Sequence, residues 1–291
     1  MKVKDGKGLM LRIDSHHHIW DISVRPQTWM QGDEVKPISR TILMNELEPE
    51  LEKAKIDYTV IVQTVATVDE TPEFLDLSLS HPKICAVVGW LDLESDDVRP
   101  QLEKYLAHPA GKNLVSIRDL AQDKEDPNWL LRDNVVRNIH RIGEAGLAFD
   151  ILTRPPQLAA AVEMVKMSPN NSFVLDHISK PYIGKGEMQP WAKQISEIAS
   201  HENVVVKVSG LFTEANWSDW NHQTFKPYLD HILKSFSPSR MMFGSDWPVC
   251  LLAATYTDTI NLMEEFTKDF TKSEQELFWA GTAKRVYKLE V

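Results

Sequence analysis

Short apolar runs alternate with amphipathic stretches along nearly the whole chain. Eight of these runs are rich in β-branched or aromatic residues and end at polar, Gly or Pro residues, as strands buried on both faces do. The runs lie at 9–13, 58–62, 84–88, 114–117, 147–152, 173–175, 204–208 and 241–243. The pattern therefore predicts eight buried strands.

The stretches between the runs carry the spacing of helices. Val135, Ile139 and Ile142 recur on one helical face, and Pro155-Pro156 stands where a first helical turn is expected. Eight strand–helix units of this kind predict an α/β protein with a single (β/α)8 TIM barrel. We expect one domain over 1–291, with 1–9 as an N-terminal extension or the start of strand one.

A doubly wound open sheet is the alternative fold. Such a sheet usually carries a Gly-rich phosphate loop after its first strand. Here the first strand runs instead into Asp14-Ser15-His16-His17-His18. The barrel is therefore favoured.

Composition excludes several classes of protein. The 291 residues contain 32 Lys and Arg against 42 Asp and Glu, a formal net charge of −10, with no basic run for nucleic acid or an anionic membrane. No apolar stretch approaches the roughly 20 residues of a membrane span. Cys85 and Cys250 lie far apart, which fits neither a disulfide framework nor a metal motif. We expect a cytoplasmic protein, and the sequence leaves its oligomeric state undetermined.

The three consecutive histidines at the end of the first strand are the first chemical signal. Residues two apart share a face of a strand, so His16 and His18 should point together, with Asp14 beneath them. His17 should point away and be structural. Barrel active sites form at the carboxyl ends of the strands, and two neutral imidazoles suit a divalent metal. The alternative is a polar strand terminus without a ligand.

Strands eight and six supply two further candidates. Asp246 shares a face with Gly244, whose missing side chain leaves room for a close approach, so Asp246 should project into the barrel mouth. It could instead cap the following turn. The sixth apolar run breaks into Asp176-His177, and we expect His177 to lie across the barrel from the other two histidines. A lone histidine at a strand end is often structural.

Other polar and aromatic residues fall in the same layer. The forked donors of Arg118 suit a carboxylate, carbonyl or polyol oxygen, although an ion pair with a neighbouring aspartate is the alternative. We expect Lys207, inside a run of valines, to neutralise Asp14 or Asp246. The predicted substrate-binding residues are Trp29, Gln63, Trp90, Arg154 and Trp247.

Four segments together resemble a known family. The segments 13–21, 176–181, 207–210 and 243–248 are similar to signature segments of the amidohydrolase-related family. They most closely resemble its branch of sugar lactonases and 2-pyrone-4,6-dicarboxylate hydrolases, over the chain from about residue 12 to the end. The resemblance implies a (β/α)8 barrel that hydrolyses a cyclic ester, most often an aldonolactone such as L-fuconolactone or L-rhamnonolactone.

The chain departs from the wider superfamily at two ligand positions. The binuclear members use a bridging Lys or Glu from strand four and a His from strand five, where this chain offers Arg118 and Asp150. A two-metal centre is therefore not predicted. Two alternatives stay open: one zinc or manganese ion on His16, His18 and Asp246, or no metal at all.

These residues lead to a hypothesis for the reaction. Water attacks the lactone carbonyl with Asp246 as general base, while His177 and Arg118, or a metal, polarise the carbonyl. The few arginines at the mouth favour a neutral polyol lactone over a pyrone dicarboxylate. The remaining alternatives are a 2-pyrone-4,6-dicarboxylate hydrolase, a lactone isomerase, a metal-dependent decarboxylase and a barrel that only binds a sugar acid.

Overall fold

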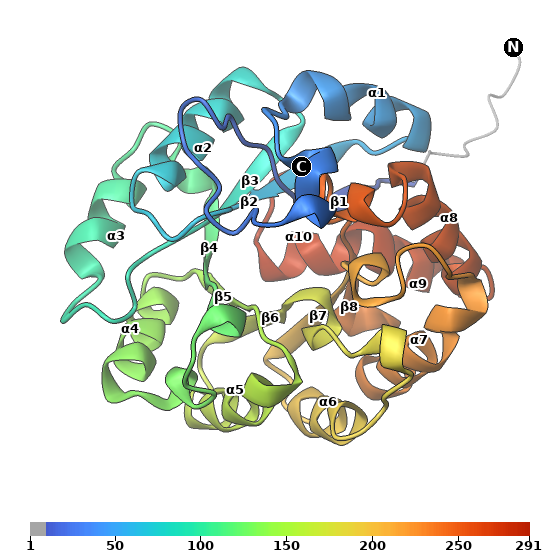
Figure 1. The fold of residues 1–291 in the computed structure, drawn as a ribbon. Helices are drawn as coiled ribbons and strands as arrows, with labels where there is room; N and C mark the ends of the chain where they lie inside the picture. The colour runs from blue at the N-terminus through green and yellow to red at the C-terminus, as the bar shows by residue number, and fades with distance from the viewer. Residues whose placement is uncertain (1–9) are drawn as a thin grey trace, which may run out of the picture.

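A computed structural model describes residues 10–291 of the protein and contains a ring of eight parallel strands (Figure 1). Each strand pairs with its sequence neighbours, in the order β1 to β8. The strands are β1 (Ile13–His17), β2 (Tyr58–Val62), β3 (Ile84–Gly89), β4 (Leu114–Asp119), β5 (Ala148–Ile151), β6 (Ser172–Leu175), β7 (Val204–Val208) and β8 (Met241–Phe243). The predicted α/β barrel is confirmed, while the expected extension at 1–9 lies outside the described residues.

The ring closes through backbone contacts between the end of β1 and the segment that follows β8. His17 and Trp247 form a parallel bridge, and the His18 N–H donates to the Trp247 carbonyl at 2.6 Å. The Asp246 N–H donates to the His16 carbonyl at 2.8 Å. The same few residues therefore join the two ends of the sheet and carry the histidines and the aspartate singled out in the sequence.

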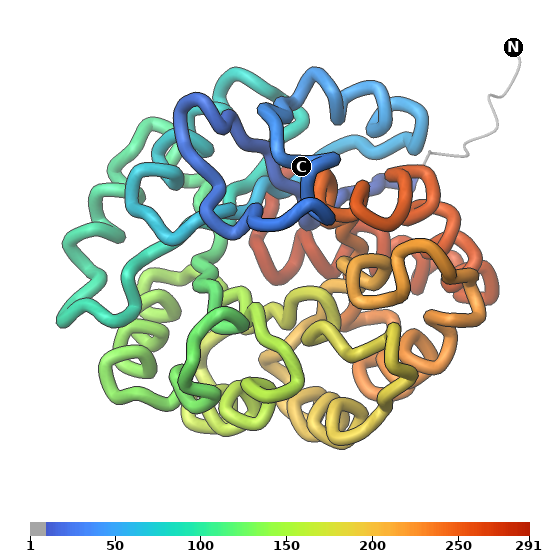
Figure 2. Tube along the Cα trace, in the orientation of Figure 1, coloured from blue at the N-terminus to red at the C-terminus, as the bar shows by residue number. Residues whose placement is uncertain are grey.

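Helices surround the strands and follow one another around the ring (Figure 2). In α4 (Asp133–Glu144), Val135, Ile139 and Ile142 are fully buried, as the helical spacing predicts, and the next helix begins at Pro155. The helices are α1 (Met44–Ala54), α2 (Glu70–Ser80), α3 (Arg99–Leu106), α4 (Asp133–Glu144), α5 (Pro155–Met167), α6 (Trp191–Ala199), α7 (His222–Phe236), α8 (Tyr256–Thr267), α9 (Lys272–Glu276) and α10 (Thr282–Val286).

Small and branched side chains fill the inside of the barrel. Val60, Val62 and Val88 are fully buried in a cluster that also takes in Ala283 and Tyr287 from the C-terminal segment. This segment therefore covers one end of the barrel interior, and α10 lies behind the ring in Figure 1. The functional site is therefore expected at the other end of the barrel, where the carboxyl ends of the strands lie.

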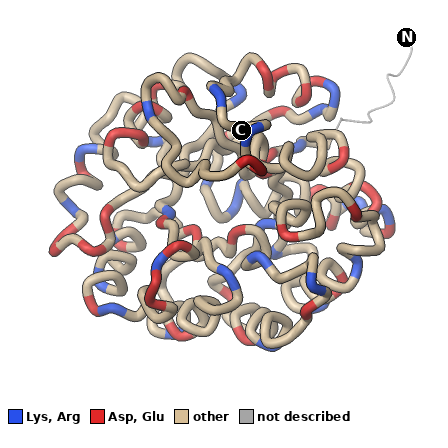
Figure 3. The backbone as a smooth tube through the Cα atoms, viewed as in Figure 1, with Lys and Arg blue, Asp and Glu red and all other residues tan. Residues whose placement is uncertain are grey.

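Charged residues of both signs are interspersed over the helices (Figure 3). Within residues 10–291, no helix is long and apolar enough to cross a membrane. Cys85 and Cys250 are both free thiols.

Candidate active site

Strand β1 carries His16 into the centre of the site. Its pairing with β2 is irregular between Asp14 and His17, so the strict alternation expected from the sequence breaks there. Asp14 does not lie beneath the histidines as expected: its carboxylate accepts hydrogen bonds from the Tyr256 hydroxyl of α8 at 3.0 Å and the Ser245 N–H at 2.9 Å. His17 is fully buried and lies outside the clusters formed by the other histidines.

A backbone carbonyl sets the orientation of His18. Its Nδ1 lies 2.7 Å from the Val62 carbonyl, which can only accept, so Nδ1 carries the proton. The lone pair of Nε2 then faces His16 Nε2 at 3.2 Å and Asp246 Oδ1 at 3.5 Å. Burial lowers the pKa of His18 and so favours this neutral form.

Asp246 lies close to His16 and His18 because of two backbone features, its own left-handed conformation and the glycine at position 244. Its own φ is 57°, a left-handed conformation that aspartate tolerates, and its Oδ1 is 3.7 Å from His16 Nε2. A Cβ on the preceding Gly244 would lie 2.7 Å from the Cβ of His16, so only glycine fits there. Burial alone would raise the pKa of Asp246, but its polar and charged neighbours, the Lys180 ammonium among them, outweigh it and lower that pKa. Asp246 is therefore ionised.

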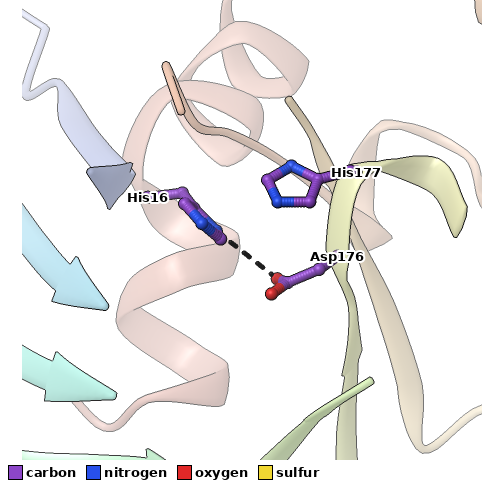
Figure 4. Close-up of side chains that lie close together, drawn as sticks. All are labelled: His16, Asp176 and His177. Carbon is purple, nitrogen blue, oxygen red and sulfur yellow. Dashed lines mark ion pairs between the residues drawn. The ribbon is translucent and has the colours of Figure 1, made fainter. Parts of the chain in front are cut away.

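His177, from the segment after β6, meets His16 of β1 although these two strands are not neighbours in the ring. The two ring centroids are 4.4 Å apart, and His177 Nε2 is 3.9 Å from Asp246 Oδ1 (Figure 4). Because φ is 51° at His177, the chain turns inward after β6 instead of continuing the strand direction. Ser209 shares a hydrogen bond of 2.9 Å with His177 Nδ1, and burial lowers the pKa of His177 well below its usual value.

Arg118 reaches the site from β4, but its donors are already largely engaged. Nη2 donates to the carbonyl of Gln63 at 2.6 Å and to its side-chain oxygen at 3.1 Å. Nη1 donates to Asp176 Oδ2 at 3.1 Å and lies 3.3 Å from His16 Nε2. Arg118 therefore orders the floor of the site, beside the histidines, through Gln63 and Asp176.

Lys207 does not neutralise Asp14 or Asp246. Its Nζ lies 2.6 Å from Asp150 Oδ2 and 3.1 Å from Asp176 Oδ1, and all three side chains are fully buried. The registers of β4 to β7 place these carboxylates beside it, which the separate strands did not reveal. Burial opposes ionisation of Asp176, but Lys207 and Arg118 outweigh it and lower its pKa.

His16, His18 and Asp246 form a cluster that fits one divalent metal ion. Their donor atoms are 3.2, 3.5 and 3.7 Å apart, close to the roughly 3.4 Å between ligands around a tetrahedral ion with bonds of about 2.1 Å. Asp176 Oδ1 faces His16 Nδ1 at 3.6 Å, beside the ion pair that the same oxygen forms with Lys207 (Figure 4). A carboxylate behind a histidine is the usual support of a metal ligand.

A cavity of about 420 Å³ opens above this cluster. His18, His177, Arg118 and Asp246 line it. Of the residues predicted to bind substrate, Trp29 and Arg154 also line it.

The other three predicted substrate-binding residues are buried outside the cavity lining. Gln63 supports Arg118, and the backbone of Trp247 closes the barrel. Trp90 follows β3 and is buried, and its backbone N–H donates to Thr71 Oγ1. Of the five predicted substrate-binding residues, only Trp29 and Arg154 are therefore placed to contact a ligand in the cavity.

Sequence reasoning missed four charged residues that line the cavity: Glu34, Asp123, Lys180 and Glu214. Lys180 and Glu214 are close enough to each other to form an ion pair. Both stand in loops that follow strands, Lys180 just before Pro181 and Glu214 after β7. Their positions could have indicated them, because charged residues in the loops after barrel strands often line the active site.

The family was decided by comparison with known proteins. A family model described as Amidohydrolase matches residues 13–289. The chain belongs to the amidohydrolase family. The match confirms the resemblance carried by the four sequence segments.

Two relatives from Burkholderia multivorans align with nearly all of this amidohydrolase. One, named L-fucono-1,5-lactonase, is 34% identical over 292 residues, covering 96% of each protein. The other is a solved amidohydrolase structure with bound zinc, with TM-score 0.89 and 33% identity over 96% of this chain and 99% of that chain.

A third relative shares the fold alone. A solved structure from Pseudomonas putida, whose name proposes a 2-pyrone-4,6-dicarboxylic acid hydrolase, has TM-score 0.75 at 19% identity. It covers 97% of this chain and 99% of that chain. Its fold supports the barrel and carries no argument about the substrate.

Proposed function

We propose that this amidohydrolase is a lactonase that opens the ring of a small sugar lactone by hydrolysis. One observation carries the proposal: an ionised carboxylate, Asp246, lies at the floor of a ligand-sized cavity with His18 and His177 within 4 Å of its Oδ1. The relative named L-fucono-1,5-lactonase supports an aldonolactone as substrate.

Asp246 acts as the general base. Because its carboxylate is ionised and lines the cavity, it accepts a proton from a water molecule placed against the lactone carbonyl. The proton then passes to the ring oxygen as the ester bond breaks. The product is one molecule with a hydroxyl group and a carboxylic acid, and the acid then releases its proton to solvent.

His177 stabilises the negative charge that develops on the carbonyl oxygen. It is neutral and faces the cavity, and with Ser209 donating its hydroxyl proton to Nδ1, the Nε2–H is the donor offered beside Asp246. Arg118 adds positive charge from the floor, where Gln63 and Asp176 fix it. An alkoxide leaves an ester more readily than an amine leaves an amide, so this modest help suffices.

We propose that zinc is the metal held by His16, His18 and Asp246, with manganese as the alternative. The donor spacing of the cluster and the zinc in the Burkholderia structure support it. When bound, the ion would supply Lewis acidity to the carbonyl. Asp246 Oδ1 belongs to the donor set, which leaves Oδ2 as the basic oxygen.

The charges of the cavity favour a neutral lactone over a pyrone dicarboxylate. Three cations line the cavity, but each faces a carboxylate of the protein: Arg118 faces Asp176, while Arg154 and Lys180 face Glu214. These carboxylates would repel a substrate that carries two negative charges. The cellular location is a separate prediction: the two distant cysteines, Cys85 and Cys250, suggest the cytoplasm.

A substrate panel with product analysis tests the proposed function. Aldonolactones, unsubstituted lactones and 2-pyrone-4,6-dicarboxylate are each incubated with the enzyme, and products are identified by NMR while acid release is measured at constant pH. Hydrolysis releases one equivalent of acid per lactone and yields the open hydroxy acid. Ring isomers without acid, carbon dioxide, or no turnover of any lactone would contradict it.

A further inference from the structure

Four consecutive residues after β6 adopt a left-handed backbone. The φ angles are 51° at His177, 48° at Ile178, 58° at Ser179 and 45° at Lys180, and none of these residues is glycine. This conformation costs roughly 1–2 kcal/mol per residue. Such strain persists where the surrounding structure holds it, and it concentrates at functional sites.

Two neighbours, Trp191 and Thr153, hold this left-handed turn in place. The indole N–H of Trp191 donates to the Ile178 carbonyl at 2.7 Å, and Ile178 itself is fully buried. The hydroxyls of Thr153 and Ser179 share a hydrogen bond of 2.7 Å. These hydrogen bonds hold the middle of the turn. The side chains at its two ends, His177 and Lys180, line the cavity.

Lys180 enters the cavity with its donors free. Its side chain is only 14% exposed, and its Nζ lies 3.9 Å from Glu214 Oε1. The ammonium makes no hydrogen bond to any residue within 10–291. An ammonium has three donors, so a ligand in the cavity would find them unused.

Glu214 lies between Lys180 and a second cation. Its Oε2 accepts a hydrogen bond from Arg154 Nη1 at 3.1 Å, and its side chain is only 9% exposed. The cavity wall therefore presents a donor, an acceptor and a donor in a row. A hydroxyl group both donates and accepts, so two neighbouring hydroxyls match this row, whereas a hydrocarbon ring satisfies none of it.

We propose that Lys180, Glu214 and Arg154 form a subsite for adjacent hydroxyl groups of the lactone ring, which makes the enzyme selective for hydroxylated lactones over alkyl lactones. The inference rests on the proposed lactonase function and adds the residues that set its substrate preference. A site built to hydrogen-bond a hydroxyl rejects the analogue that lacks it, because its own polar groups are then left unpaired.

The test compares two substrates that differ only in the hydroxyls: a pentono-1,5-lactone, which is an aldonolactone, and δ-valerolactone. In Lys180→Met and Glu214→Gln, kcat/KM for the aldonolactone should fall roughly 10- to 100-fold, the effect of losing one charged hydrogen bond. For δ-valerolactone it should change less than about 3-fold, since that ring reaches neither group. Lys185→Met, an exposed lysine of the same loop that lies over Tyr182, is the matched control and should change neither value.

Two further measurements keep the proposal falsifiable. Lys180→Gly removes the side chain while easing the left-handed backbone, so it serves if Lys180→Met fails to fold. A hydroxylated lactam, which the enzyme should not hydrolyse, reports binding by calorimetry even if the wild type turns over no lactone. Its Kd should weaken by the same factor in the variants, while δ-valerolactam is unaffected.

Two results would overturn the subsite. One is an equal fall in kcat/KM for both lactones, which would give Lys180 a general structural role. The other is unchanged binding of the hydroxylated lactam in both Lys180→Met and Glu214→Gln. Absence of lactone turnover in the wild type, with lactam binding still dependent on Lys180, would contradict the proposed function and leave the subsite supported.

Discussion

Gly244 and His16 pack so closely that a Cβ on residue 244 would lie 2.7 Å from the Cβ of His16. The same Cβ would lie 3.2 Å from that of Ser209, on the other side. Neither neighbour is the flexible end of a long side chain, so one of them would have to move. The absence of a side chain at 244 therefore fixes how near His16 lies to Asp246.

Gly244→Ala should displace His16 and impair the site. We expect a loss of about 1–3 kcal/mol in the free energy of unfolding, as overpacking usually costs, and a fall in activity of at least about 10-fold. Urea unfolding and lactone turnover measure the two effects. Gly281→Ala is the control, because there the nearest atom, at 3.1 Å, is a methyl of Leu277. Full activity in Gly244→Ala would contradict the packing argument.

Zinc should stabilise the wild type and fail to stabilise a ligand variant. An ion that binds only the folded state at 100 times its Kd adds about 2.7 kcal/mol, which corresponds to a Tm rise of several degrees. In His18→Gln the rise should disappear. His81→Gln, at a partly exposed histidine away from the cavity, should keep it. An equal rise in Tm for His18→Gln would place the metal elsewhere.

Much of the site could be predicted because it follows from strand geometry. In a barrel the strand ends meet, so His16, His18, His177 and Asp246 had to approach one another. The interior partners of Lys207 depended instead on the registers of neighbouring strands, which no single run of residues reveals.

The backbone outside the regular strands was harder to predict. The irregularity in β1 turned Asp14 toward Tyr256, and the left-handed turn at 177–180 moved His177 beside His16 and brought Lys180 into the cavity. Non-glycine residues rarely adopt such φ values, so no local propensity indicates them. The result depends on partners distant in sequence, such as Trp191.

Activity on hydroxylated lactones should fall with rising pH as Lys180 loses its proton. Burial lowers the pKa of Lys180 from 10.5, so the ammonium is lost at a lower pH than in an exposed lysine. The protonated form donates to the substrate, so kcat/KM is retained below the lowered pKa and lost above it.

Lys180→Arg separates this titration from other effects. Arginine stays charged throughout, so the alkaline fall should be absent or move to higher pH. Initial rates, corrected for non-enzymatic hydrolysis, provide the profile. An identical alkaline fall in Lys180→Arg would assign it to another group.

Lys207→Met should destabilise the barrel strongly. It would leave Asp150 and Asp176 buried without their shared cation, and removing one partner of a buried ion pair costs about 3–5 kcal/mol. Lys226→Met breaks an exposed pair with Asp230 on α7 and should cost far less. Urea unfolding compares the two variants. Equal stability of the two variants would show that the interior charges are dispensable.

The most direct measurement is the turnover of an aldonolactone by Asp246→Asn. The amide keeps the shape of the side chain but cannot take a proton from water, so kcat should fall roughly 10²- to 10⁴-fold while circular dichroism stays unchanged. Asp230→Asn, at an exposed position of α7, should match the wild type. A fall of this size, with one equivalent of acid released per lactone by the wild type, is the predicted result. Turnover within a few-fold of the wild type in Asp246→Asn would contradict it.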